Sequence, residues 1–285
     1  MAFPLTRPRF DWQLRTRTLA LGEETLLMGI LNLTPDSFSD GGQFTSPQTA
    51  LDQALWLLDE GAAILDLGGE STRPDSTPVT AEEEQARILP VLAAILKARP
   101  DAVISIDTYH ASTARRAAEA GAEIVNDVSG LLWDAEMAST AAETRCGLVL
   151  THTRGTPQEW ATQTRLAPSE VIPIVLEGLR SQLATASAAG IPANAIVLDP
   201  GFGFGKRGEE NFVLHAHLAD LQQLGHPLLV GTSRKGFLGK EIHATTASNV
   251  AAILAGAHIL RVHEIRPAAE AAAVADKILL AATQS

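Results

Sequence analysis

The sequence predicts a single α/β domain built as a (β/α)8 TIM barrel, and two observations support this prediction. Eight short apolar runs of strand length alternate with eight amphipathic stretches of helix length, which is the pattern of repeated βα units around a parallel sheet. Polar, Gly-rich motifs follow most of the apolar runs, where each strand would pass into its helix. A parallel barrel gathers the carboxyl ends of its strands at one mouth, so we expect these motifs to form a single site.

The predicted strands and helices come in eight pairs. The strands are expected at Leu26–Asn32, Ala63–Leu67, Val103–Ile106, Glu123–Asn126, Leu148–Thr151, Ala195–Leu198, Pro227–Val230 and His258–Arg261. The helices are expected at Pro47–Glu60, Ala81–Ala98, Ser112–Ala120, Asp134–Glu143, Ser169–Ala188, Glu209–Leu224, Thr246–Ala255 and Pro267–Ala282. Eight pairs close such a barrel, whereas an open doubly wound sheet, the competing fold, usually has fewer strands and a nucleotide fingerprint after its first strand.

The chain shows no shift in composition, linker or low-complexity tract that would divide it. We therefore predict one barrel over residues 26–285 and a short N-terminal extension over residues 1–25. Phe10 and Trp12 in this extension are expected to pack against the bottom of the barrel. Thr80 precedes a run of three Glu residues, which is a start signal for the helix that follows.

Composition excludes several classes of function. The chain carries 33 acidic and 22 basic residues, a net charge of -11, which argues against non-specific binding to nucleic acids or anionic membranes. No secretory leader and no apolar run of about 18 residues is present, so we expect a soluble, cytoplasmic protein. The lone Cys146 excludes an intrachain disulfide and lies in an apolar stretch, so we expect a buried structural thiol.

Two connections, residues 34–46 and 68–80, are longer and richer in Gly, Ser and Pro than the others. Long loops at the catalytic face of a barrel tend to be mobile and to order when a ligand binds. We interpret both as a functional lid over the mouth. An ordinary surface loop is the alternative.

Five motifs together resemble the dihydropteroate synthase family, the target of sulfonamides. They are Met28 to Gly42, Asp66 to Pro74, Asp199 to Lys206, Ser233 to Lys235 and Arg261 to His263, and the likeness extends from about Trp12 to Leu280. The resemblance implies a TIM barrel that condenses 6-hydroxymethyl-7,8-dihydropterin diphosphate with p-aminobenzoate. The products would be 7,8-dihydropteroate and pyrophosphate, and Mg²⁺ would assist. It also implies small-molecule substrates and a homodimer.

The resemblance assigns the pterin to Asp199, Asn126 and Asp107. A pterin presents a guanidine-like edge, which a carboxylate can bind through two parallel hydrogen bonds, and an amide can both donate and accept. Taken singly, each of these residues could be a turn or strand-end cap. Phe204 is expected to pack against a ring of the substrate, with core packing as the alternative.

Basic residues are expected to recognise the anionic part of the substrate. Arg261 and His263 are two positions apart at a strand end, so they point the same way and suit a diphosphate. An exposed charge pair on the rim is the alternative for these two. In the family, Lys235 contacts the pterin and Ser233 lies near the p-aminobenzoate. Arg261, His263 and Lys235 are the predicted catalytic residues.

The resemblance places two further groups at the mouth. Thr72, Arg73 and Pro74 are expected to shape the arylamine pocket, and Asn32 resembles the residue that the family associates with Mg²⁺. Mg²⁺ keeps most of its waters and binds substrate phosphates, so one neutral protein ligand is chemically reasonable.

The sequence departs from the family at one strand end and leaves two other functions open. Thr151-His152-Thr153 stands where the family commonly has Met-His-Met or Met-His-Asn, so one apolar wall of the pterin pocket is expected to be replaced. Without a second His or Cys at ligand spacing, His152 is expected to be a polar strand-end residue rather than a metal ligand. The alternatives are a methyltetrahydrofolate–corrinoid methyltransferase, which has no use for a diphosphate site, and a non-catalytic pterin-binding paralogue.

Overall fold

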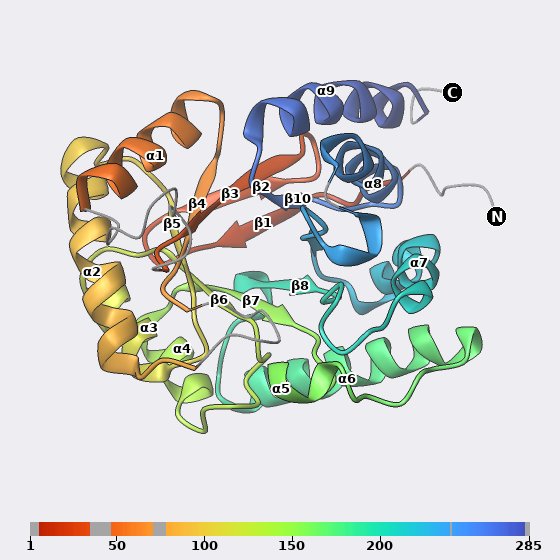
Figure 1. Cartoon of the computed structure of the whole chain (residues 1–285), viewed down its shortest axis with the longest axis horizontal. Coiled ribbons are helices and arrows are strands. Elements are labelled where there is room, and N and C mark those ends of the chain that lie inside the picture. The colour runs from red at the N-terminus through yellow and green to blue at the C-terminus, as the bar shows by residue number, and fades with distance from the viewer. Residues whose placement is uncertain (1–5, 35–46, 71–77, 240, 283–285) are drawn as a thin grey trace.

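Eight parallel strands form a barrel with helices outside it, as the alternating pattern predicts (Figure 1). The computed structural model describes residues 6–34, 47–70, 78–239 and 241–282. In chain order the strands are β3 (Leu26–Asn32), β4 (Ile64–Gly68), β5 (Ile104–Asp107), β6 (Ile124–Asp127), β7 (Gly147–Thr151), β8 (Ile196–Asp199), β9 (Leu229–Val230) and β10 (Ile259–Val262). The sheet order is β8-β7-β6-β5-β4-β3-β10-β9, and a parallel bridge between Leu198 and Leu228 joins its two edges.

Helices alternate with the strands and cover the outside of the barrel (Figure 1). They are α1 (Pro47–Asp59), α2 (Ala81–Ala98), α3 (Ala111–Glu119), α4 (Met137–Thr144), α6 (Pro168–Ala188), α7 (Glu209–Ala216), α8 (Ile242–Leu254) and α9 (Ile265–Ala282), with the short α5 (Pro157–Trp160) before α6. Thr80 begins α2 as predicted: its hydroxyl accepts from the Glu83 N–H, and the Glu83 carboxylate accepts from the Thr80 N–H, both at 3.2 Å. This reciprocal pair satisfies N–H groups that the first helical turn leaves unbonded.

Four predicted elements differ in the structure, and one of them, helix α8, begins at Ile242 rather than Thr246. The helix predicted over Glu209–Leu224 ends at Ala216, and Leu218–Leu224 forms the 3₁₀ segment η2 after His217 leaves the helical conformation. The last strand before β10 forms a ladder with β10 only at Leu229–Val230; Leu228 makes a single bridge to Leu198, and Pro227 has no N–H to donate to a ladder. Helix α4 begins at Met137 rather than Asp134, whose carboxylate instead accepts from the N–H groups of Ala111 and Glu136.

Inside the barrel, the N-terminal ends of the strands form an apolar floor. It consists of Met28, Ile64, Val103, Ile124, Val149, Val197, Leu229 and Ile259. The antiparallel hairpin β1 (Phe10–Gln13) and β2 (Thr18–Leu21) covers this floor with Trp12, which is 1% exposed and donates from Nε1 to the Ala195 carbonyl at 2.9 Å. The hairpin packs closely against the start of β7 because Gly147 has no side chain there. A Cβ on Gly147 would lie 2.6 Å from a methyl carbon of Leu14.

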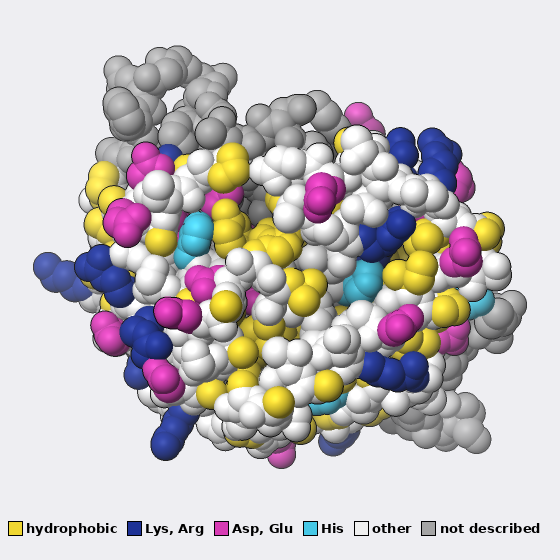
Figure 2. All heavy atoms as spheres, turned by 90° about the horizontal axis from the view of Figure 1, so that it is seen from below, with side chains coloured by type: hydrophobic (Ala, Val, Ile, Leu, Met, Phe, Trp, Pro, Cys, Tyr) yellow, Lys and Arg dark blue, Asp and Glu magenta, His cyan; other side chains and the backbone are white. Residues whose placement is uncertain are grey.

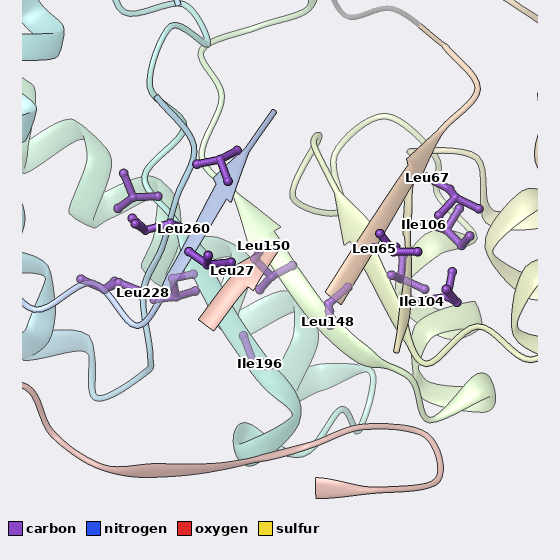
Figure 3. Close-up of a cluster of buried hydrophobic side chains, with 14 of the residues drawn as sticks. Leu27, Leu65, Leu67, Ile104, Ile106, Leu148, Leu150, Ile196, Leu228 and Leu260 are labelled. Carbon is purple, nitrogen blue, oxygen red and sulfur yellow. The ribbon is translucent and has the colours of Figure 1, made fainter. Parts of the chain in front are cut away.

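A second apolar core lies between the barrel and its helices. Its strand residues include Leu27, Leu65, Leu67, Ile104, Ile106, Leu148, Leu150, Ile196, Leu228 and Leu260, shown in Figure 3. On β4, these outward residues alternate with Ile64 and Asp66, so one strand serves two environments. Cys146 is buried in this core and burial raises its thiol pKa to about 11, so it is a structural thiol as expected.

The surface gives no sign of a large region of one charge on the face drawn in Figure 2, where acidic and basic side chains are interspersed. Among the helices of the described ranges, none combines the length and apolarity that crossing a membrane requires.

Candidate active site

Directly above the apolar floor, the inward-facing residues of the barrel become polar. The stagger of the strands brings Asp66 of β4, Asn126 of β6, Asp199 of β8 and Arg261 of β10 to one level. Alternate strands of a TIM barrel normally fill such a level with four branched apolar side chains. Here the level holds two carboxylates, one amide and one guanidinium. We call these four residues, Asp66, Asn126, Asp199 and Arg261, the polar layer.

Asp66 lies at the centre of the hydrogen bonds within the polar layer. Its Oδ2 accepts from Arg261 Nε at 2.6 Å and from Asn126 Nδ2 at 3.0 Å. The side chain is fully buried, and its Oδ1 has no hydrogen-bond partner among the described residues. Arg261 also donates from Nη2 to Asp107 Oδ2 at 2.5 Å, so one guanidinium joins two carboxylates.

The charges of the site are held by opposing effects of burial and pairing. Burial disfavours a charged Arg261, but Asp66 and Asp107 outweigh it and raise the guanidinium pKa above its ordinary value. Burial raises the pKa of Asp107 to about 7, against the lowering effect of Arg261. Burial likewise raises the Asp199 pKa, opposed by Lys235. The site therefore places the carboxylates of Asp66, Asp107 and Asp199 close to the cationic groups of Arg261 and Lys235.

The loop after β8 is fixed by Lys206. Its ammonium donates to the carbonyl oxygens of His152 at 3.0 Å, Gly201 at 2.7 Å and Phe204 at 3.4 Å, which uses all three of its N–H donors. Gly201 has φ +68°, and a Cβ there would lie 1.9 Å from the His152 carbonyl oxygen, so only glycine fits. The Gly201 N–H also donates to Asp199 Oδ1 at 2.7 Å, which orients the carboxylate.

Lys235 and Phe204 meet at one wall of the mouth. Lys235 Nζ lies 4.2 Å from the centroid of the Phe204 ring and donates to the Phe202 carbonyl. The half-buried Phe204 ring also packs against Trp160, with 4.6 Å between centroids, so it belongs to both a small aromatic cluster and the mouth. Burial lowers the Lys235 pKa to about 8, opposed by Asp199.

The turns after β9 and β10 are joined side by side. Ser233 Oγ lies 3.0 Å from His263 Nδ1 and accepts from the His263 N–H at 3.3 Å, so the serine O–H is placed to donate to Nδ1. Arg234, in the left-handed region at φ 57°, pairs with Glu264 in the same two turns. The alternative of an exposed rim pair is wrong for Arg261, whose side chain is only 20% exposed and makes two ion pairs.

Asn32, Gly68 and Asp107 flank a small space at the ends of three neighbouring strands. A Cβ on Gly68 would lie 3.6 Å from Asp107 Oδ2 and 3.7 Å from Asn32 Oδ1, so glycine keeps the space between these oxygens open. Within the described part of the chain, no group of three or more His, Cys, Asp or Glu residues could hold a metal ion. A cation here would need further ligands from substrate or water.

His152 directly follows β7, as predicted, and its ring points away from the mouth. The ring is 3% exposed and lies against Gly178 of α6, and burial lowers its pKa well below the ordinary value. Thr151, the residue before it, ends β7 and is 1% exposed. Thr72, Arg73 and Pro74 lie outside the described residues, as does most of the predicted lid.

Asp66 is the central residue that sequence reasoning left out of the site. The available signal was a carboxylate between Leu65 and Leu67, inside an apolar run, at the start of one of the motifs. Asp and Glu are rarely fully buried unless they are paired. An acidic residue in such a run therefore indicates a buried partner, which Arg261 supplies.

Comparison with known proteins identifies the group to which these features belong. The family described as pterin binding enzyme matches residues 28–263 of the chain. The dihydropteroate synthase of Synechocystis is 40% identical over 96% of this chain and 94% of its own length. That of Bacillus subtilis is 40% identical over 92% of this chain and 91% of its own length.

Solved structures agree with the sequence comparison. The Yersinia pestis dihydropteroate synthase with a sulfonamide drug superposes with a TM-score of 0.87, at 35% identity, over 97% of this chain and 100% of that one. The Xanthomonas albilineans dihydropteroate synthase in complex with 7,8-dihydropteroate superposes with a TM-score of 0.81, at 34% identity, over 98% of this chain and 99% of that one.

Proposed function

The chain belongs to the family of pterin-binding enzymes, and we infer that it catalyses the dihydropteroate synthase reaction of folate biosynthesis. This transferase joins the methylene carbon of 6-hydroxymethyl-7,8-dihydropterin diphosphate to the amine of p-aminobenzoate. The identity of 40% with named synthases over 96% of the chain carries the inference. The polar layer supports it, because it combines carboxylate, amide and guanidinium groups in one mouth.

The pterin is bound, in this proposal, by Asp199, Asn126 and Asp107. Asp199 is 7% exposed, and the Gly201 N–H holds one of its oxygens. A buried carboxylate gains most from a ligand that offers two parallel N–H donors, since such a bond is charge-assisted and bidentate. Asn126 is fixed through its Nδ2 to Asp66, so its Oδ1 is directed to another partner.

Arg261 and His263 take the departing diphosphate. The bond between the methylene carbon and the diphosphate oxygen breaks, the arylamine nitrogen forms the new bond to carbon, and its proton is released. Positive charge at the methylene is delocalised into the electron-rich pterin, and the cationic groups stabilise the leaving anion. An arylamine is nearly neutral at pH 7, so no strong general base is assigned.

The arylamine lies, in this proposal, beside Ser233 and Phe204, and Lys235 contacts both it and the pterin. Thr72, Arg73 and Pro74 complete the arylamine pocket by family resemblance. Lys235 and Phe204 supply a cationic group and an aromatic surface 4.2 Å apart. A carboxylated aromatic ring has chemistry complementary to both.

Mg²⁺ is proposed as the cofactor, and the donor set fits it. The amide oxygen of Asn32 borders the space beside Gly68, while Asp107 Oδ2 on the other side of Gly68 already accepts from Arg261. Oxygen ligands suit this ion, which also binds through substrate phosphates and waters. When bound, it would neutralise charge on the diphosphate.

A homodimer is proposed on family analogy and on one surface feature. Val274 and Ile278 of α9, one helical turn apart, are 59% and 43% exposed. Ile242, at the start of the neighbouring α8, is 37% exposed. These apolar side chains would be covered in a dimer. Sedimentation of the wild type and of Val274→Glu tests this proposal.

A coupled assay for pyrophosphate release tests the proposed function. With the pterin diphosphate present, we expect release that depends on added p-aminobenzoate and product that matches 7,8-dihydropteroate. Arg261→Ala should lower the rate strongly, whereas Arg180→Ala, on the exposed face of α6, should not. Methyl transfer to a corrinoid protein without pyrophosphate release would instead favour the methyltransferase.

A further inference from the structure

A single oxygen of Asp66 links two strands that do not touch each other. Asp66 is in β4, while its donors Arg261 and Asn126 are in β10 and β6, each separated from β4 by one intervening strand. Both links therefore cross the inside of the barrel. The residues are 195 and 60 positions from Asp66 in the sequence.

The chemistry of this oxygen fixes how both donors are presented. A carboxylate oxygen accepts hydrogen bonds, so it turns Nδ2 of Asn126 toward itself and Oδ1 away. It also occupies Nε of Arg261, which leaves the Nη groups for Asp107 and for an anion. Without Asp66, the amide could flip and the guanidinium could rotate.

Stability alone does not account for a carboxylate at this position. An apolar group of similar volume often replaces a buried ion pair with equal or greater stability. The same level in other barrels is filled by branched apolar side chains. One Asp66 oxygen also lacks a partner among the described residues, which is unfavourable in a purely structural ion pair.

We propose that Asp66 is a positioning residue that sets Asn126 for the pterin and Arg261 for the diphosphate at the same time. The proposal rests on the function proposed above and extends it, because it assigns to one buried carboxylate the alignment of the two halves of the substrate. In this proposal Asp66 acts through Asn126 and Arg261, which contact the substrate.

Two ligands test the pterin half and the diphosphate half of the substrate separately. They are 6-hydroxymethylpterin, which has no phosphate, and inorganic pyrophosphate with Mg²⁺. Calorimetric titration of Asp66→Asn should show at least ~10-fold weaker binding of each, about 1.4 kcal/mol. Asn keeps the size of Asp, so the barrel should fold, and Asp66→Ser provides a second variant. Far-ultraviolet circular dichroism checks the fold of each.

Double-mutant cycles distinguish positioning from a general structural effect. In an Asn126→Ala background, Asp66→Asn should weaken pterin binding less than ~3-fold further, because its target is already gone. In an Arg261→Ala background, it should weaken pyrophosphate less than ~3-fold further, yet still weaken the pterin ~10-fold. A structural effect would give additive losses in every background.

The control is Glu123→Gln, a carboxylate that precedes β6, is 3% exposed and accepts from the Thr16 N–H, at the opposite end of the barrel from the polar layer. It should leave both affinities within ~3-fold of the wild type. Additive losses, or unchanged affinities in Asp66→Asn, would overturn the positioning role. If the variants show non-additive losses but the wild type releases no pyrophosphate with p-aminobenzoate, the positioning role of Asp66 stands and the synthase assignment is overturned.

Discussion

The floor and the mouth of the barrel are built from the same strands, yet their inward side chains are opposite in character. On β4, β6, β8 and β10 the floor residues are Ile64, Ile124, Val197 and Ile259. Two positions further along each strand, on the same face, are Asp66, Asn126, Asp199 and Arg261. The barrel thus concentrates apolar burial at one end and charged chemistry at the other.

Buried polar groups have different environments at the floor and at the mouth of the barrel. At the floor, the ring of His258 accepts from the Leu228 N–H at 3.1 Å and lies 2.9 Å from the Pro8 carbonyl, an arrangement that suits a neutral imidazole. Burial lowers its pKa to about 4. At the mouth, Arg261 is instead paired with the carboxylates of Asp66 and Asp107. The floor should therefore govern stability and the mouth ligand binding, and four predictions test that division.

The largest effect is expected at the floor. Trp12→Ala should lower the free energy of unfolding by about 3–5 kcal/mol, because it removes a fully buried indole and leaves a cavity. Urea denaturation measures this change. Trp56→Ala, at a position that is 46% exposed, is the control and should cost far less. A loss of pterin affinity in folded Trp12→Ala would break the division.

His258 should make the floor sensitive to acid. Its pKa of about 4 in the folded protein lies below the unfolded value, so the unfolded state binds more protons between these two values. Stability should then fall by about 3 kcal/mol as the pH drops from about 6.5 to 4. Unfolding of wild type and His258→Asn across this range should show a smaller slope in the variant. The exposed His243→Asn should retain the wild-type slope.

At the mouth, Asp199→Asn should weaken binding of a free pterin by about 2–3 kcal/mol, since an amide satisfies only part of the bidentate pattern. Its free energy of unfolding should not fall. Burial raises the pKa of Asp199, so the ionised group does not favour the folded state at neutral pH. Calorimetry and urea denaturation on the same samples give both quantities. Unchanged affinity would remove Asp199 from the site.

The smallest effect concerns the charge on Lys235. Its pKa of about 8 means that it is protonated below that pH and loses its charge as the pH rises. Pterin affinity should fall severalfold between pH 7 and 9, and Lys235→Met should lose this dependence, apart from titration of the ligand itself. An identical pH profile in the variant would show that the ammonium does not contribute to the pterin site.

The local sequence pattern was sufficient to predict the barrel because the apolar residues of each strand indicate that the strand is buried. The apolar run from Leu26 to Leu31 and the motif after it predict a strand and a site wherever the strand lies in space. The strands lie where they were predicted, with small shifts at their ends. The helix that ends at Ala216 was overestimated, because the change to a 3₁₀ turn at His217 has no strong signal in the sequence.

The sequence by itself determined the fold, the end of the barrel that carries chemistry and most of the residues that gather there, since these depend on alternation and on the order of motifs. Only the tertiary structure decided which of those residues touch. The pairing of Arg261 with Asp66 depends on strand stagger and closure of the sheet across 195 positions, as does the burial of His152 against α6 rather than at the mouth. Such contacts are set by the geometry of the whole barrel, which no local run of residues encodes.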